Sequence, residues 1–355
     1  MARTAVVSSP KYLNHKTGFC HPESPSRVRV AMRELNKSGI LETESCSLVE
    51  PKIARVKDLK LVHKRDYIQL VQLVCKAGGG LLDHEDTVVS PESFDVARLA
   101  VGGTLKAVDM VMDDDFRNAF ALVRPPGHHA GPYYAKGFCV FNNVAVAASH
   151  LIEKFNLTRV LILDVDAHHG NGTQEIFYGS DKVLYISLHE DPCEFPLTGF
   201  VDEVGENEGL GYTVNIPLPF GTSDSIYLRA FKEVAVPIIT KYKPQFILVS
   251  TGFDNYHNDP VGELSLSVYS HIKIFDAVLD LASKFCQDKL VAVLEGGYNL
   301  RVLGKMVTAV TARMAGIHYS IRDKHPIEIS SIQKKGEKTI KEVKRIHSMF
   351  WDIKS

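Results

Sequence analysis

The sequence lacks closely spaced cysteine pairs. Its six cysteines are scattered along the chain, at Cys20, Cys46, Cys75, Cys139, Cys193 and Cys286. This spacing favours neither a zinc ribbon nor a disulfide framework. A chain of 355 residues buries roughly three quarters of its unfolded surface, so it needs no such crosslink to fold.

Long apolar runs and an excess of one charge are also missing. No segment reaches the about 18 apolar residues of a membrane helix, and the N-terminal stretch MARTAVVSSPKYLNH is too poor in apolar residues for a signal peptide. The formal net charge is −1, which leaves no general positive field for a nucleic-acid backbone. These absences predict a cytoplasmic protein, or a nuclear one in a eukaryote, without membrane binding or direct nucleic-acid binding.

Short β-branched runs alternate with longer amphipathic segments. Strands are expected at residues 119–123, 159–165, 182–189, 212–218, 245–251 and 289–294. Several of these runs, such as RVLILDV and FILVST, are apolar on both faces, which is typical of central strands in a covered parallel sheet. Helices are expected at residues 26–38, 67–77, 91–111, 141–155, 224–242, 267–285 and 300–316. The alternation predicts an α/β fold with helices on both sides of the sheet.

The chain shows no linker, internal repeat or low-complexity segment. We therefore expect one main domain over residues 1–320. The remaining residues, 321–355, form a mildly basic tail in which Ile340, Val343, His347 and Phe350 recur at helical spacing. This pattern predicts a last helix that packs on the domain, and a helix that extends from it to bind a partner is the alternative.

Chemically unusual residues follow four of the expected strands. RPPGHHA follows the strand at 119–123, DVDAHHGNG overlaps the end of 159–165, GFD follows 245–251 and EGGY follows 289–294. In an open α/β sheet, functional residues gather at the carboxyl ends of the strands. We therefore expect these four motifs to meet in one site.

The second and third of these motifs predict a metal site. Asp164, Asp166 and His168 are two residues apart and share one side of an extended chain. If Asp166, His168 and Asp254 bind the ion, coordination positions stay open for water and substrate, as at a catalytic zinc site. Asp164 is then expected to accept hydrogen bonds or to bind a second cation. The alternative is that these residues are helix caps or exposed loop residues.

Two adjacent histidines and a tyrosine complete the expected site. His128 and His129 suit general acid and base roles beside a metal-bound water, and Asp164 and Asn171 are candidates to hold their second ring nitrogens. Tyr298 follows two glycines and is placed to polarise a carbonyl from the opposite side. A purely structural role for each residue is the alternative.

Taken together, the motifs resemble the zinc-dependent histone deacetylase superfamily. The resemblance spans about residues 3–317 and rests on HPESPSR, RPPGHHA, GFCVFNNVA, LDVDAHHGNGTQEIF, YISLH, STGFDNYHNDP and EGGYNL. It implies a single-domain, three-layer arginase/deacetylase fold with a central eight-stranded parallel sheet. The motifs GNG and PPGHHA, with Asn171 in place of an aspartate, are similar to the class II-like branch that also includes acetoin-utilization proteins and acetylpolyamine amidohydrolases.

The resemblance also implies roles for single residues. Zn²⁺ would be bound by Asp166, His168 and Asp254, and His129 would be the general base with His128 as its electrostatic partner. Asp164 would hold His128, Asn171 would hold His129, and Tyr298 would stabilise the transition state. A monovalent cation such as K⁺ would be held by Asp164, Asp166, His168, Ser187 and Leu188. The substrate tunnel would be lined by Gly137, Phe138, Phe195 and Val261, with Asp86 at its rim.

The chain departs from the family pattern at the stretch Pro196-Leu197-Thr198-Gly199 and at Tyr256, and both changes are expected to reshape the tunnel mouth. Val261 stands where a polyamine-selective branch carries glutamate, which counts against polyamines as substrates.

We therefore expect zinc-dependent hydrolysis of the acetyl amide of N-acetyl-lysine, with a zinc-bound water activated by the two histidines and the oxyanion stabilised by zinc and Tyr298. The alternatives are a deacetylase of small acylated amines such as acetylpolyamines, and a catalytically silent acyl-lysine reader. A manganese ureohydrolase is disfavoured, because its second aspartate is replaced by Tyr256.

Overall fold

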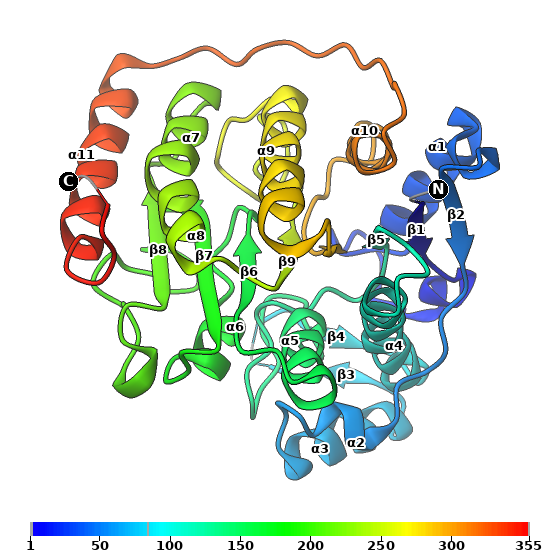
Figure 1. Ribbon diagram of the computed structural model, residues 1–355. Coiled ribbons are helices and arrows are strands. Elements are labelled where there is room, and N and C mark those ends of the chain that lie inside the picture. The colour runs from blue at the N-terminus through cyan, green and yellow to red at the C-terminus, as the bar shows by residue number, and fades with distance from the viewer. Residues whose placement is uncertain (1–2, 84, 354–355) are drawn as a thin grey trace.

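The computed structural model describes residues 3–83 and 85–353, and its centre is a parallel sheet (Figure 1). The strands are β1 (Thr4–Val7), β2 (Cys46–Val49), β5 (Asn118–Ala121), β6 (Val160–Asp164), β7 (Val183–Glu190), β8 (Thr213–Leu218), β9 (Phe246–Thr251) and β10 (Leu290–Leu294). They lie in the order β2-β1-β5-β10-β9-β6-β7-β8, and every pairing is parallel. The predicted single-domain fold class with an eight-stranded parallel sheet is confirmed.

Helices cover both faces of this sheet (Figure 1). Along β6, Leu161 and Leu163 belong to the core on one face, whereas Val160 and Ile162 belong to the core on the other. The first face is covered by α1 (Ser26–Ser38), α7 (Asp224–Ala230), α8 (Val236–Tyr242), α9 (Val268–Cys286), α10 (Leu303–Met314) and α11 (Ser330–His347). The second is covered by α3 (Arg65–Lys76), α4 (Ser93–Met112) and α5 (Asn143–Phe155). Burial on both faces explains the continuous apolar runs.

Smaller elements complete the fold. They are α2 (Val56–Leu59), α6 (Asn171–Phe177), the antiparallel pair β3 (Gly80–Leu81) and β4 (Val88–Val89), and 3-10 turns at Pro10–Asn14, Ile40–Glu42 and Asn207–Gly209. None of the helices in the described residues is both long and apolar enough to cross a bilayer.

Two differences from the sequence-based expectation have clear causes. The strands β1 and β2 were not predicted, because each has four residues and they lie in a third of the chain that otherwise has helical patterns. The helix expected over 224–242 is interrupted by a π-helical turn at Phe231–Ala235. Pro237 lies at the start of α8, and a proline inside a helix removes one amide donor and clashes with the preceding turn.

The C-terminal segment packs on the domain. Residues 315–329 cross the helical layer from α10 to α11, and α11 contacts β8 and α7 (Figure 1). Ile340, Val343 and His347 are buried. Beyond α11, the indole Nε1 of Trp351 donates a hydrogen bond to the carbonyl of Gly211 at 2.9 Å.

The buried imidazole of His347 predicts a pH-dependent stability. Within the described residues neither ring nitrogen has a hydrogen-bond partner, and burial lowers the pKa of His347 from 6.5 to about 4. Between these values the unfolded chain binds more protons than the folded chain, so the free energy of unfolding falls as the pH drops. His347→Leu should therefore reduce the loss of stability between about pH 7 and pH 4 by up to about 3 kcal/mol.

Urea denaturation of the wild type and of His347→Leu at several pH values measures this difference. The matched control is His318→Leu, because His318 is exposed. If the wild type and His347→Leu lose stability equally on acidification, the imidazole is not the group responsible.

Candidate active site

The sheet order brings four strand ends together. The strands β5, β10, β9 and β6 are consecutive neighbours, and their carboxyl ends lie at the same edge because all are parallel. His128 and His129 follow β5, Asp254 follows β9, and Asp166 follows β6. All four side chains are buried. A parallel sheet with this order therefore explains why residues far apart in the chain form one cluster.

Asp166, His168 and Asp254 form a candidate metal centre. One ligand atom from each lies within 4.8 Å of the others, and His168 Nδ1 is 3.1 Å from Asp254 Oδ2 and 3.4 Å from Asp166 Oδ1. The remaining carboxylate oxygens are held by the backbone: Asp166 Oδ2 accepts from the amide of Gly296 at 2.8 Å and Asp254 Oδ1 from the amide of Ala167 at 3.0 Å.

This donor set fits a divalent cation. Two carboxylates and one imidazole are typical zinc ligands and leave coordination positions open. Burial lowers the pKa of His168, but its hydrogen bonds to Asp166 and Asp254 raise that pKa well above the usual value. The two carboxylates thus favour a positive charge between them, and a metal ion would supply that charge in place of the imidazole proton.

The two adjacent histidines have different partners. His128 Nδ1 lies 3.1 Å from Asp164 Oδ2, whereas His129 Nδ1 lies 2.8 Å from Asn171 Oδ1. Burial lowers the pKa of His128, but Asp166 and Asp164 raise it to about 10. Burial lowers the pKa of His129 well below its usual value, and the charges of His128 and His168 lower it further. The shifts separate the two rings: the pKa of His129 favours a neutral ring that can accept a proton, whereas that of His128 favours a charged ring.

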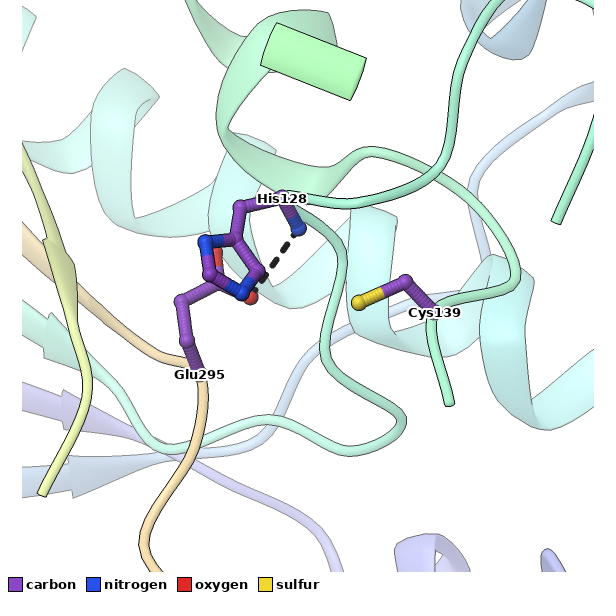
Figure 2. A group of neighbouring side chains, drawn as sticks. All are labelled: His128, Cys139 and Glu295. Carbon is purple, nitrogen blue, oxygen red and sulfur yellow. Dashed lines mark hydrogen bonds between the residues drawn. The ribbon is translucent and has the colours of Figure 1, made fainter. Parts of the chain in front are cut away.

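The loop that carries His128 is fixed by Glu295. Its Oε2 accepts hydrogen bonds from the amides of Gly127 at 2.7 Å and His128 at 3.2 Å. Figure 2 shows the Glu295 carboxylate beside the His128 ring, with the Cys139 thiol directed toward both. Burial raises the pKa of Glu295 to about 7. Neither Glu295 nor Cys139 was predicted to have a role, because their contacts with the His128 loop depend on the fold.

The expected tunnel residues line one cavity of about 240 Å³. Its walls are Asp86, His129, Gly137, Phe138, His168, Phe195, Val261 and Tyr298. The ring of Phe138 meets Tyr298 edge-on at 5.8 Å, and that of Phe195 meets His129 edge-on at 5.0 Å. Gly137 has a φ of +54°, and a Cβ there would lie 2.5 Å from His129 Cδ2. Only glycine lets this wall come so close to the imidazole.

The residues expected to hold a monovalent cation include Asp166 and His168 of the candidate metal centre and residues of β6 and β7. Asp164 and Ser187 are register partners in β6 and β7. Asp164 Oδ1 accepts from the amide of Asp166 at 3.2 Å, and the Leu188 carbonyl accepts from the Tyr227 hydroxyl at 3.2 Å. A cation at this place stays a prediction.

Tyr256 does not itself line the cavity, and an effect of this residue on the tunnel mouth stays a prediction. The side chain is buried, its hydroxyl donates to Asp323 Oδ1 at 3.0 Å, and it is not among the residues that line the cavity. Tyr256 instead ties the segment after Asp254 to the C-terminal crossing segment. The partner, Asp323, lies outside the motifs on which the expectation rested.

A buried charge cluster of Glu23, Arg27 and Arg124 lies next to Tyr298. The Glu23 carboxylate lies between the guanidinium groups of Arg27, at 3.1 Å, and Arg124, at 2.6 Å. Arg27 also donates to the carbonyl of Gly297 at 2.7 Å and stacks over the Tyr298 ring at 4.7 Å from its centroid. The cluster therefore holds Tyr298 in place. This cluster was not predicted, because nothing in the sequence pattern pairs Glu23 with Arg124, which is 101 positions away.

Removal of Glu23 should strongly destabilise the protein. Glu23→Ala leaves two fully buried guanidinium groups without their carboxylate, and breaking a buried ion pair costs about 3–5 kcal/mol. The free energy of unfolding from urea denaturation should fall by that amount. Glu44→Ala is the control at an exposed glutamate, and it should change stability by less than about 0.5 kcal/mol. Equal effects of the two variants would contradict the argument.

Comparison with known proteins decides the family. Residues 21–314 match the model of the histone deacetylase domain. The chain belongs to the histone deacetylase family. It is therefore a member of a family of deacetylases, which are hydrolases.

Relatives of this deacetylase-family chain match along most of its length. A probable deacetylase of Archaeoglobus fulgidus is 40% identical and is matched over 98% of each chain. A histone deacetylase-like amidohydrolase of Pseudomonas aeruginosa is 37% identical, over 85% of this chain and 79% of that protein. The crystal structure of the HDA15 HD domain superposes with a TM-score of 0.88 at 35% identity, covering 99% of this chain and 96% of that chain.

Proposed function

We propose that this chain hydrolyses the acetyl amide of N-acetyl-lysine in proteins or peptides, with Zn²⁺ held by Asp166, His168 and Asp254. The observation that carries the proposal is the cavity of about 240 Å³, which has two aromatic walls and includes His129, His168 and Tyr298 in its lining. A cavity of this kind suits a straight apolar methylene chain that ends in a neutral amide.

The metal would act as the Lewis acid. When bound, Zn²⁺ supplies Lewis acidity that polarises the amide carbonyl and makes a neighbouring water molecule more acidic. Asp166, His168 and Asp254 would hold the ion beside the cavity, since His168 itself is part of the cavity wall.

The protein residues move the protons and hold the charge. His129 accepts a proton from the attacking water at Nε2, because its Nδ1 is bonded to Asn171. As the new C–O bond forms, Tyr298 donates a hydrogen bond to the oxyanion, and burial raises the pKa of Tyr298 well above its usual value, so that it keeps its proton. His129 then gives its proton to the departing amine as the C–N bond breaks, which releases acetate and lysine.

His128 has a different part in this scheme. It is buried against Asp164. Burial lowers the pKa of His128, but the charges of Asp166 and Asp164 raise it to about 10, which favours the protonated ring. A fixed positive charge beside His129 disfavours a second charge on that ring. The proton on His129 is therefore readily returned to the amine.

A small acylated amine is the second candidate substrate. Among the described residues, Asp86 Oδ1 has no hydrogen-bond partner although it is buried, and Asp86 lines the cavity. This carboxylate suits either the backbone amides of a peptide or the ammonium group of a polyamine. Val261 in the cavity wall adds no second carboxylate, which favours the peptide.

Turnover of two substrates tests the proposal. Zinc-loaded protein is assayed with an acetyl-lysine peptide and with N-acetylspermidine, and a hydroxamate serves as the inhibitor control. We expect a higher kcat/KM on the peptide and loss of turnover with the hydroxamate. A preference for N-acetylspermidine would support the small-amine function, and peptide binding without turnover would support a silent reader.

A further inference from the structure

The orienting partner of His129 is a neutral amide, which can present two different faces. With Oδ1 toward the ring, Asn171 accepts from Nδ1–H, and Nε2 is free to take a proton. With Nδ2 toward the ring, Nδ1 becomes the acceptor and the proton stays on Nε2. A carboxylate accepts in either orientation. Only the first orientation of Asn171 makes His129 a base, so the amide has to be fixed.

Two residues that do not line the cavity are linked to this amide: Tyr134 contacts Asn171, and Glu175 contacts Tyr134. Asn171 Nδ2 donates to the Tyr134 hydroxyl at 3.1 Å and to the backbone carbonyl of His129 at 3.4 Å. The Tyr134 hydroxyl donates in turn to Glu175 Oε2 at 2.6 Å. Asn171 and Glu175 are four residues apart on α6, so they lie on the same helix face. The Tyr134 hydroxyl bridges them.

The direction of this chain of hydrogen bonds is set by Glu175. An ionised carboxylate only accepts, so the phenolic proton of Tyr134 points to Glu175. The phenolic oxygen then offers only lone pairs to Asn171. Of the two polar atoms of the Asn171 amide, only Nδ2 can donate a hydrogen bond to that oxygen. Oδ1 therefore faces His129.

Tyr134 is held in this position by the loop that carries the histidines. The Gly131 amide donates to the Tyr134 carbonyl at 3.0 Å. A Cβ at Gly131 would lie 2.5 Å from Tyr134 Cε1, so the ring packs directly on that backbone. The phenol is half-buried, whereas Glu175 is exposed.

We propose that Tyr134 and Glu175 are positioning residues that lock the amide of Asn171 and thereby fix His129 in the tautomer that accepts a proton at Nε2. The inference rests on the proposed role of His129 as the base. It explains how the neutral amide of Asn171 can orient His129, a task for which a carboxylate would need no further hydrogen bonds to fix its orientation.

The tautomer of His129 is the direct readout. Nitrogen NMR of ¹⁵N-histidine-labelled, zinc-loaded protein distinguishes Nδ1–H from Nε2–H, and the His129 signal is the one that disappears in His129→Gln. We expect Nδ1–H in the wild type and a mixture with Nε2–H in Tyr134→Phe and Glu175→Ala. The kcat on the acetyl-lysine peptide should fall by about 2- to 12-fold, as for one lost hydrogen bond, with KM nearly unchanged. The matched control is Tyr133→Phe, because Tyr133 is the exposed neighbour of Tyr134.

A second background separates positioning from mere structural support. In Asn171→Asp the carboxylate accepts in any orientation, so adding Tyr134→Phe should change neither the tautomer nor kcat relative to Asn171→Asp alone. The proposal would be wrong if Tyr134→Phe lowered kcat equally in the wild-type and Asn171→Asp backgrounds. It would also be wrong if the His129 tautomer were unchanged in Tyr134→Phe alone. If the tautomer shifts as expected but the wild type hydrolyses no acyl amide, the lock stands and the proposed function fails.

Discussion

Replacing Asp254 by asparagine will abolish both zinc binding and hydrolysis. Asp254 Oδ1 is held by the Ala167 amide, and Oδ2 faces His168 Nδ1. Asparagine keeps the shape but removes one of the two negative charges that favour a cation. In the proposed mechanism a metal ion contributes several kcal/mol to the transition state, so kcat/KM on the acetyl-lysine peptide should fall by about 10³-fold or more.

Elemental analysis for zinc beside the turnover assay tests this expectation. The matched control is Asp276→Asn, which removes a surface carboxylate that pairs with Arg313 at 2.7 Å. The control should keep one zinc per chain and its activity. Full zinc content in Asp254→Asn would show that the ion lies elsewhere.

Removing only the hydroxyl of Tyr298 should lower kcat by about 10²–10³-fold, the usual cost of one oxyanion donor. The phenylalanine ring of Tyr298→Phe would keep the edge contact with Phe138 and the stacking of Arg27. Because the hydroxyl acts on charge that develops in the transition state, KM should change little.

Steady-state kinetics on the acetyl-lysine peptide separates the two constants. Tyr319→Phe is the control, because its hydroxyl bonds to Glu34 and Tyr319 is not among the residues that line the cavity. A kcat for Tyr298→Phe close to that of the wild type would remove Tyr298 from the mechanism. A change in KM alone would assign Tyr298 to substrate binding.

The fold was predictable where strands are buried on both faces. The strand β6 is apolar from Val160 to Leu163 and buried along its whole length, so its sequence identifies it without knowledge of its neighbours. The edge strand β2 was missed because it has four residues of mixed burial, with Leu48 48% exposed. Such a strand is defined by its pairing with β1, which a local pattern does not contain.

The residues of the candidate site likewise include some that could be predicted from the sequence and some that could not. The grouping of Asp166, His168 and Asp254 follows from parallel strands whose ends share one edge, and a sequence reveals those strand ends. Glu23 and Tyr134 were not assigned roles, since their partners are fixed by packing between distant segments. A charged residue is usually exposed, so nothing local distinguishes a buried Glu23 from a surface glutamate.

The C-terminal helix has a consequence for the integrity of the whole molecule. β8 is the last strand of the sheet, and α11 lies against it (Figure 1). Without residues from 321 onward, β8 would offer a free edge for pairing with another chain, and Tyr256 would lose Asp323. We therefore expect a chain cut after α10 to aggregate more readily than the intact chain and to hold the segment after Asp254 less firmly.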